Sequence, residues 1–198
     1  MAPGDPYARV DDYAATFPNY DRHDEAELGR QLLAMSRHIE TRCGQQFNKD
    51  TTPTTRTYRI EYTDTVLHTA PMAAAPTLLR MDSNGDGLFA LTVTGALASR
   101  YGDVNGRPLN ELYLPPWAAG ATQFPSGYLV EVTAIHGWDA VPEQVRLATV
   151  HLTALLRLET PRATSSIDEL GREVGMSPQG RGIVDDLLAA FKPPQVVV

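Results

Sequence analysis

The chain has 198 residues, of which 42% are hydrophobic, and its 17 basic and 24 acidic residues give a formal net charge of -7. This length suits one domain with an inserted lobe, and the acidic balance argues against a protein that wraps DNA through a broad basic surface. The single cysteine, Cys43, excludes a disulfide-stapled secreted domain. No signal peptide and no stretch of roughly 18 apolar residues is apparent, so we expect a soluble protein that folds in a reducing compartment.

The first 50 residues predict an arm followed by a long helix. Residues 1–20 are typical of a loosely structured arm with one short helical turn, which Pro18 ends. The helix is predicted from Asp24 to Cys43, with acidic residues in its first turn and Gly44 as its C-terminal stop. Its apolar positions share one face at a period of about 3.6 residues: Leu28, Leu32, Met35, Ile39 and Cys43.

Residues 54–138 change to the alternating pattern of half-buried strands. Tyr58, Ile60 and Tyr62 alternate with polar residues, which is the period of a strand with one buried side. The segment 100–127 is rich in Gly, Pro and Asn and predicts a long loop. Strands are expected at 58–62, 77–81, 88–94, a short one at 112–114, and 128–135.

A second long helix is predicted from Pro142 to Glu159. Proline suits a first helical turn, and the apolar stripe of this helix comprises Val145, Ala148, Thr149, Leu152, Leu155 and Leu156. A polar, Gly-rich connection follows at 160–182. A short final helix runs from Gly182 to Phe191, and Pro193 ends it before an extended tail.

These elements predict an α+β chain with a small helical-bundle core, made of two long helices and short terminal helices, and a β-rich insertion between the long helices. The predicted organisation is one structural domain with an inserted lobe. Its segments are the arm and first core helix at 1–50, the β-rich insertion at 51–138, the second core helix at 139–160, and the connection, C-terminal helix and tail at 161–198.

One turn resembles a calcium-binding loop. Asp82, Asn84, Asp86 and Gly87 match the first, third, fifth and sixth positions of an EF-hand loop, whose last position requires a bidentate carboxylate. That last position is Val93, and strands rather than helices flank the loop. The sequence therefore favours a β-turn of residues that tolerate a positive φ, and no metal site is expected.

A second segment resembles a DNA-binding module. Residues 168–177 are similar to the first helix and turn of a helix-turn-helix motif. The helix after them carries Asp185 and Asp186 with a single nearby cation, Arg181, whereas a recognition helix needs donors to bases and phosphates. The segment favours a short docking helix, and a small DNA-binding regulator using 168–190 is the alternative function.

The sequence contains no pattern typical of catalysis. The histidines form no closely spaced metal-ligand pair, and neither a G-x-S-x-G elbow nor a G-x-x-x-x-G-K-[ST] phosphate loop is present. His136 and Asp139 allow a His–Asp site, but a corner between a strand and a helix explains this stretch better. Cys43 lies on an apolar helix face and is typical of a small core residue. We expect no enzyme activity, no catalytic residues and no cofactor.

Three stretches carry a resemblance to a known family. They are Tyr7–Tyr13 (YARVDDY), Leu32–Phe47 (LLAMSRHIETRCGQQF) and His136–Thr149 (HGWDAVPEQVRLAT). In this order they resemble the Y-A-x-x-x-D-[LY], L-L-x-x-A-S-x-x-I-D-x-x-x-G-R-x-F and G-[WY]-x-x-[VI]-P-x-[DE]-[VI]-[KR]-x-A-[TV] stretches of the head-to-tail connector, or adaptor, proteins of tailed bacteriophages. Met35 departs from the usual alanine, and Gln45-Gln46 from the commoner Gly-Arg step.

The resemblance implies a structural protein of the virion neck, between capsid and tail, assembled in the host cytoplasm. Such adaptors form a ring of about twelve copies beneath the portal, extend the DNA channel and present a platform for the next component. The implied partners are the portal protein, a downstream neck (stopper) or tail component, and further copies of the chain. Double-stranded DNA passes through the channel without specific binding, and no membrane is involved.

The C-terminal helix carries the candidate partner interface. Its apolar stripe suits docking in a partner's groove, and packing on the chain's own core is an equal alternative. The stripe comprises Ile183, Leu187, Leu188 and Phe191. For the β-rich insertion, one further interpretation is a ligand-binding lobe that stacks a ligand on Trp117 and on the Tyr101/Tyr113 region.

Overall fold

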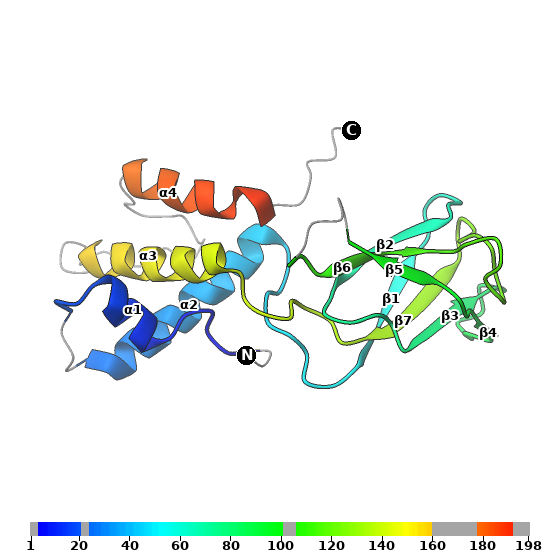
Figure 1. Ribbon diagram of the computed structural model, residues 1–198, viewed down its shortest axis with the longest axis horizontal. Helices are drawn as coiled ribbons and strands as arrows, with labels where there is room; N and C mark the ends of the chain where they lie inside the picture. Colours follow the sequence, from blue (N-terminus) through cyan, green and yellow to red (C-terminus); the bar gives the residue numbers. More distant parts are fainter. Residues whose placement is uncertain (1–3, 21–23, 101–105, 160–177, 192–198) are drawn as a thin grey trace. The chain divides into compact units, whose positions relative to one another are not determined.

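A computed structural model describes residues 4–20, 24–100, 106–159 and 178–191 (Figure 1). Its helices are α1 (Val10–Thr16), α2 (Glu25–Cys43), α3 (Glu143–Glu159) and α4 (Pro178–Leu188), which continues into a short 3-10 turn at Ala189–Phe191. Its strands are β1 (Thr54–Arg59), β2 (Val66–Met72), β3 (Leu78–Asp82), β4 (Leu91–Thr92), β5 (Leu97–Ser99), β6 (Leu109–Tyr113) and β7 (Leu129–Ala134).

The predicted fold class, a small helical bundle with a β-rich insertion, is wrong. The described residues contain four α-helices and seven strands, and the strands form two antiparallel sheets around a hydrophobic core of their own. The sequence analysis gave the helices too much weight in the predicted fold class, because the apolar period of an amphipathic helix recurs over several turns and is easy to detect. The strands give a weaker signal, since they are short and turns rich in Gly and Pro separate them.

The chain divides into two compact units, which we call the helical unit and the sheet unit. The helical unit takes residues up to Phe47 and those from Val141 onward, and the sheet unit takes Asn48–Ala140. Each unit has its own cluster of buried apolar side chains. Stability therefore comes from two separate cores.

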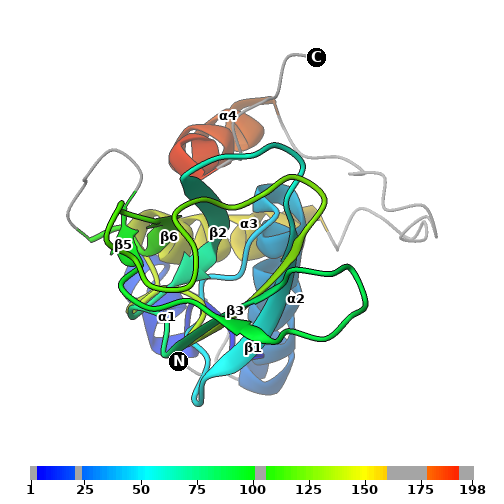
Figure 2. The same cartoon turned by 90° about the vertical axis from the view of Figure 1, so that its right-hand side faces the viewer.

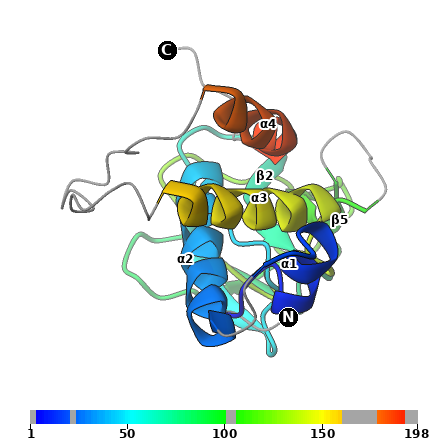
Figure 3. The ribbon, with the colours of Figure 1, turned by 90° about the vertical axis from the view of Figure 1, so that its left-hand side faces the viewer.

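Helix α3 lies at the centre of the helical unit, where α1, α2 and α4 all pack against it (Figure 3). Its Val145, Ala148 and Leu152 are fully buried. The buried hydroxyls of Thr149 and Thr153 each donate to the carbonyl four residues earlier, at 2.9 Å. Because these two hydroxyls are paired within the helix, α3 can be covered on several sides without leaving them unsatisfied.

Helix α2 forms close to the predicted position, with one correction on its buried face. Gly44 ends it in the left-handed conformation, at φ 62°, as its place after Cys43 predicted. The buried residues are Leu28, Leu32, Ser36, Ile39 and Cys43, so Ser36 occupies the buried position that the apolar pattern gave to Met35. The Ser36 hydroxyl donates to the Leu32 carbonyl at 2.7 Å, which makes burial of this polar group possible.

The sheet unit consists of two sheets that enclose one core. The four-stranded sheet has the order β1-β7-β3-β4 and the three-stranded sheet has the order β2-β6-β5. Figure 2 shows β2, β6 and β5 next to one another, from right to left. Alternate residues point inward, as Val130 and Val132 do on β7 and Leu112 does on β6. The core joins inward side chains of both sheets with Phe124 from the connection between β6 and β7.

The chain enters and leaves the sheet unit along two segments that run side by side. The Asp50 backbone N–H donates to the His136 carbonyl at 2.8 Å, and Lys49 Nζ lies 2.8 Å from Asp139 Oδ1. Gly137, at φ 101°, packs directly on the peptide of Asn48. Only a residue without a Cβ fits this crossing, so Gly137 is required both by its backbone angle and by the space.

Candidate functional site

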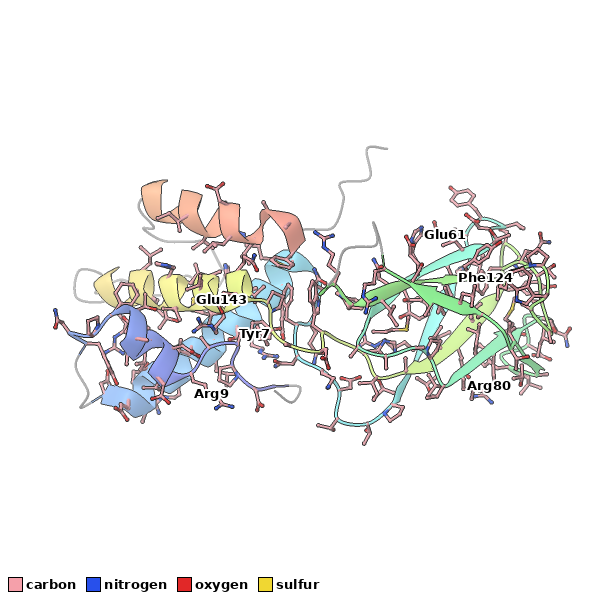
Figure 4. The ribbon with its side chains drawn as sticks, viewed as in Figure 1. Tyr7, Arg9, Glu61, Arg80, Phe124 and Glu143 are labelled. Carbon is pink, nitrogen blue, oxygen red and sulfur yellow. The ribbon has the colours of Figure 1, made fainter. Side chains whose placement is uncertain are left out.

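Two of the three stretches that resemble adaptors meet at Tyr7 (Figure 4). Tyr7 is fully buried, its backbone N–H donates to Ser36 Oγ at 2.8 Å, and its hydroxyl accepts from the Phe47 N–H at 3.0 Å. The same hydroxyl donates to the Glu40 carboxylate. Burial, together with this hydrogen bond, raises the pKa of Tyr7 well above its ordinary value, so the hydroxyl stays protonated.

The first and third stretches meet at Asp12. Arg146 Nη1 lies 2.5 Å from Asp12 Oδ1, while Asp12 Oδ2 accepts from the Arg9 N–H at 2.7 Å and so caps α1. Arg146 also pairs with Glu143, and their hydrogen bond raises the pKa of Arg146 and lowers that of Glu143. The arginine therefore ties α1 to the start of α3 through two carboxylates.

The residues that carry the family resemblance are thus mainly architectural. Their contacts hold α1, α2 and α3 in one arrangement. The pairing of Tyr7 with Glu40 could not be predicted from the sequence, because the two residues lie 33 positions apart and no local spacing connects them.

The candidate interface residues of α4 divide between core and surface. Leu188 is fully buried and Phe191 is buried with its ring edge-on to Phe47, centroids 5.4 Å apart. Ile183 is 53% exposed and Leu187 is half-buried. The sequence stripe missed Val184, which is fully buried and shifts the inward face of the helix by one position.

Polar contacts also fix α4 on the helical unit. Arg42 Nη2 lies 2.5 Å from Asp185 Oδ1, and Gln45 Nε2 donates to the Phe191 carbonyl at 2.7 Å. Docking on a partner and packing on the chain's own core therefore both remain open for the apolar stripe. Part of the stripe packs on the core, and Ile183 is exposed and available to a partner. The predicted connection at 160–182 lies outside the described residues as far as residue 177, and its last residues are wrong, because α4 already begins at Pro178. The residues from 192 onward also lie outside the described part of the chain.

The helix-turn-helix alternative is only partly within the described residues, since 168–177 lies outside them. The helix that would read DNA is α4. It buries Val184 and Leu188, and its Asp185 is paired with Arg42. Its Asp186 is exposed, and a carboxylate repels the phosphates that a recognition helix approaches.

The turn that resembles a calcium loop is held by its first aspartate. The buried Asp82 carboxylate accepts from the N–H groups of Asn84, Gly85 and Gly87, at 3.1, 2.7 and 2.8 Å. Burial works to raise the pKa of Asp82, but the backbone N–H donors outweigh it and lower the pKa. The carboxylate is thus occupied by the turn, as the β-turn interpretation predicted.

His136 and Asp139 do not form a pair. His136 is fully buried and its ring nitrogens have no hydrogen-bond partner of ordinary geometry, whereas the exposed Asp139 pairs with Lys49. The hydrogen bond from Lys49 lowers the pKa of Asp139. No group of three or more His, Cys, Asp or Glu side chains that would suit a metal ion occurs among the residues described.

Because His136 is buried, we expect the free energy of unfolding to depend on pH. Burial, and next the positive charge of Arg56, lower the pKa of His136, although Asp50 and the backbone of Val132 and Thr54 oppose this. Between the ordinary pKa of 6.5 and the lower folded pKa, only the unfolded chain binds this proton. Stability should therefore fall as pH drops below 6.5, by at most about 1.4 kcal/mol per pH unit from this group.

Urea unfolding from about pH 8 to about pH 5, compared between the wild type and His136→Leu, measures this contribution. The variant should show the shallower fall in the free energy of unfolding with decreasing pH. Equal slopes in the two proteins would show that His136 takes up its proton without cost in the folded state.

The aromatic side chains considered for ligand stacking are partly on the surface. Trp117 is 74% exposed and Tyr113 is 37% exposed, while Tyr101 lies outside the described residues. Cys43, in contrast, is buried, as a core residue should be.

Solved structures of other proteins are similar to this fold. No model of a known protein family and no curated protein matches the chain. A chain in the neck of an empty gene transfer agent (GTA) particle, computed with C6 symmetry, is similar over 96% of this chain and 92% of that chain, at 19% identity and a TM-score of 0.56. A chain in the virion of a native GTA particle covers 100% of this chain and 94% of that chain, also at 19% identity and a TM-score of 0.56.

A third chain, from the neck of a native GTA particle computed with C12 symmetry, covers 93% of this chain and 90% of that chain, at 21% identity and a TM-score of 0.48. Within the described ranges, no helix is long and apolar enough to cross a bilayer. Over nearly its whole length, the chain shares its fold with the first two of these chains, from the neck and the virion of gene transfer agent particles, which is consistent with the resemblance to head-to-tail connectors.

Proposed function

We propose that this protein is a structural component of the neck of a tailed-phage-like particle, a head-to-tail adaptor that forms a ring under the portal. The ring extends the DNA channel and offers the platform to which the next neck or tail component attaches. The observation that carries the proposal is the fold shared over 96% of the chain with a protein from the neck of a GTA particle.

The sequence motifs support the same function by a separate route. The three stretches that resemble adaptors come from residues 7–13, 32–47 and 136–149, and side chains from all three hold the helical unit together through Tyr7 and Arg146. These contacts give residues of all three stretches a common role in holding the helices in one arrangement. Sequence and fold therefore support one role.

The charge of the chain suits a channel wall. A formal net charge of -7 is repeated in every subunit of a ring. Carboxylates that face the lumen repel the phosphates of DNA, so the DNA slides through without binding. In this proposal α4 faces a partner through Ile183 and Leu187, while Leu188 and Phe191 keep the helix in place.

Electron microscopy of the purified protein mixed with its portal protein tests the proposal. We expect a ring of density below the portal, and Ile183→Glu should weaken it because a charge replaces an exposed apolar contact. Leu33→Glu is the matched control, since Leu33 is 38% exposed and lies on α2 instead of α4. Free monomers alone, together with binding to DNA at low salt in a gel shift, would favour the DNA-binding alternative.

A further inference from the structure

The outer face of the three-stranded sheet carries a row of exposed apolar side chains. The register pairs Val66 with Tyr113 and Tyr113 with Leu97, so the three residues lie side by side across β2, β6 and β5. Leu97 is 50% exposed, Tyr113 is 37% exposed and Val66 is half-buried. Neighbouring side chains on one face of a sheet touch one another, so this row forms a continuous apolar strip.

The next row on the same face is polar and is organised around one carboxylate. His68 pairs with Glu111, and Glu111 with Ser99. Glu111 Oε1 lies 3.5 Å from His68 Nδ1, and Glu111 Oε2 accepts from Ser99 Oγ at 3.2 Å. This face therefore combines an apolar strip with a fixed negative charge.

The outer face of the four-stranded sheet lies on the opposite side of the common core and has a different character. It carries small hydroxyl side chains, partly exposed leucines and arginines: Thr55, Thr57, Arg59, Leu78, Arg80, Thr92, Leu129, Glu131 and Thr133. Arg80 is neutralised by Glu131, since Arg80 Nη2 lies 2.6 Å from Glu131 Oε2. Arg59 is exposed and makes no ion pair with any residue that the structure describes.

We propose that these two outer faces bind each other between successive copies of this chain. The apolar strip of one copy covers the threonine methyl groups and leucines of the next, and Arg59 of that copy approaches Glu111 of the first. This inference rests on the proposed function, because it assigns a subunit contact within the ring that the function requires.

A second copy suits the strip better than another occupant for two reasons. The faces carry opposite charge, with the exposed Arg59 on one and the Glu111 carboxylate, held beside His68 and Ser99, on the other, and such complementarity sets the register of an interface. The faces also lie on opposite sides of the same unit, so each copy offers both halves of the contact. A contact between two different faces repeats from copy to copy and closes into a ring when the rotation permits.

A photo-crosslinking amino acid at position 97 identifies what covers the strip. The variant, Leu97→p-benzoylphenylalanine, is incorporated into portal-bound particles together with an isotope-labelled wild-type chain, and crosslinked peptides are identified by mass spectrometry. We expect crosslinks to β1, β3 or β7 of a labelled copy. The same label at Tyr62, which is 81% exposed in the turn between β1 and β2 and belongs to neither face, is the control and should give none of these.

Charge reversal tests the assigned pairing. Glu111→Arg alone and Arg59→Glu alone should each raise the concentration needed for half-maximal ring formation by about tenfold or more, and the double variant should restore part of that loss. If rings form but the label at position 97 crosslinks to the portal, to a glycan or to nothing, the proposed contact between the two outer faces is wrong and the adaptor function still stands. Chains that never associate with the portal or each other would overturn both.

Discussion

Gly137→Ala should lower the free energy of unfolding of the sheet unit by about 3–5 kcal/mol. The residue has φ 101°, where an alanine is strained, and an added Cβ would overlap the Asn48 carbonyl oxygen. It would also lie 2.8 Å from the Asn48 carbonyl carbon and 3.0 Å from Lys49 Cα. All three neighbours are backbone atoms, so no side chain can rotate away and the two crossing segments must separate.

Gly127→Ala is the matched control for this prediction. Gly127 has φ 87° and no atom within 4 Å of an added Cβ, so alanine there meets the same kind of backbone strain without a collision. It should cost about 1–2 kcal/mol. Urea unfolding monitored through the fluorescence of Trp138, which is buried beside Gly137, measures both variants. Equal losses would mean that the crossing is not as tight as described.

Leu188→Ala should cost about 2–5 kcal/mol and release α4 from the helical unit. Leu188 is fully buried, and its helix is held otherwise by Val184, Phe191 and the Arg42–Asp185 pair. A cavity beneath a helix of 11 residues removes much of what keeps it docked, because a helix of this length is marginal alone. Hydrogen exchange of the α4 amides should accelerate.

Ile183→Ala provides the comparison on the same helix. Ile183 is 53% exposed, so its truncation should change the free energy of unfolding by no more than about 0.5–1 kcal/mol and leave amide exchange in α4 nearly unchanged. If the two substitutions had the same effect, α4 would not be packed through the face that contains Leu188.

The sequence predicted the helices well where their signal was local. The limits of α2 follow from an apolar face, acidic residues in the first turn and a glycine at the end, all of which act within a few residues. The choice between Met35 and Ser36 on its buried face could not be made in this way. Ser36 is buried because Tyr7, 29 residues away, donates to it, and hydrophobic periodicity contains no such information.

The sheets were harder to predict because their pairings are distant in the chain. Thr54 lies opposite Ala134, and no property of either segment specifies the other. Short strands such as β4 and β5 leave almost no period to detect. The outer sheet faces of the proposed contact between copies could therefore not be predicted from the sequence, because only the strand register places Val66, Tyr113 and Leu97 side by side.

The close approach of the two segments at Gly137 and Asn48 has an evolutionary consequence. A module whose first and last residues emerge side by side can be exchanged for another, or for a short loop, without changing the path of the helices that flank it. Contacts within the helical unit, at Tyr7 and Arg146, join the three stretches that resemble adaptors, while the sheet unit folds around its own core. Selection can then alter the surface of the sheet unit in one lineage while leaving the flanking helices as they were.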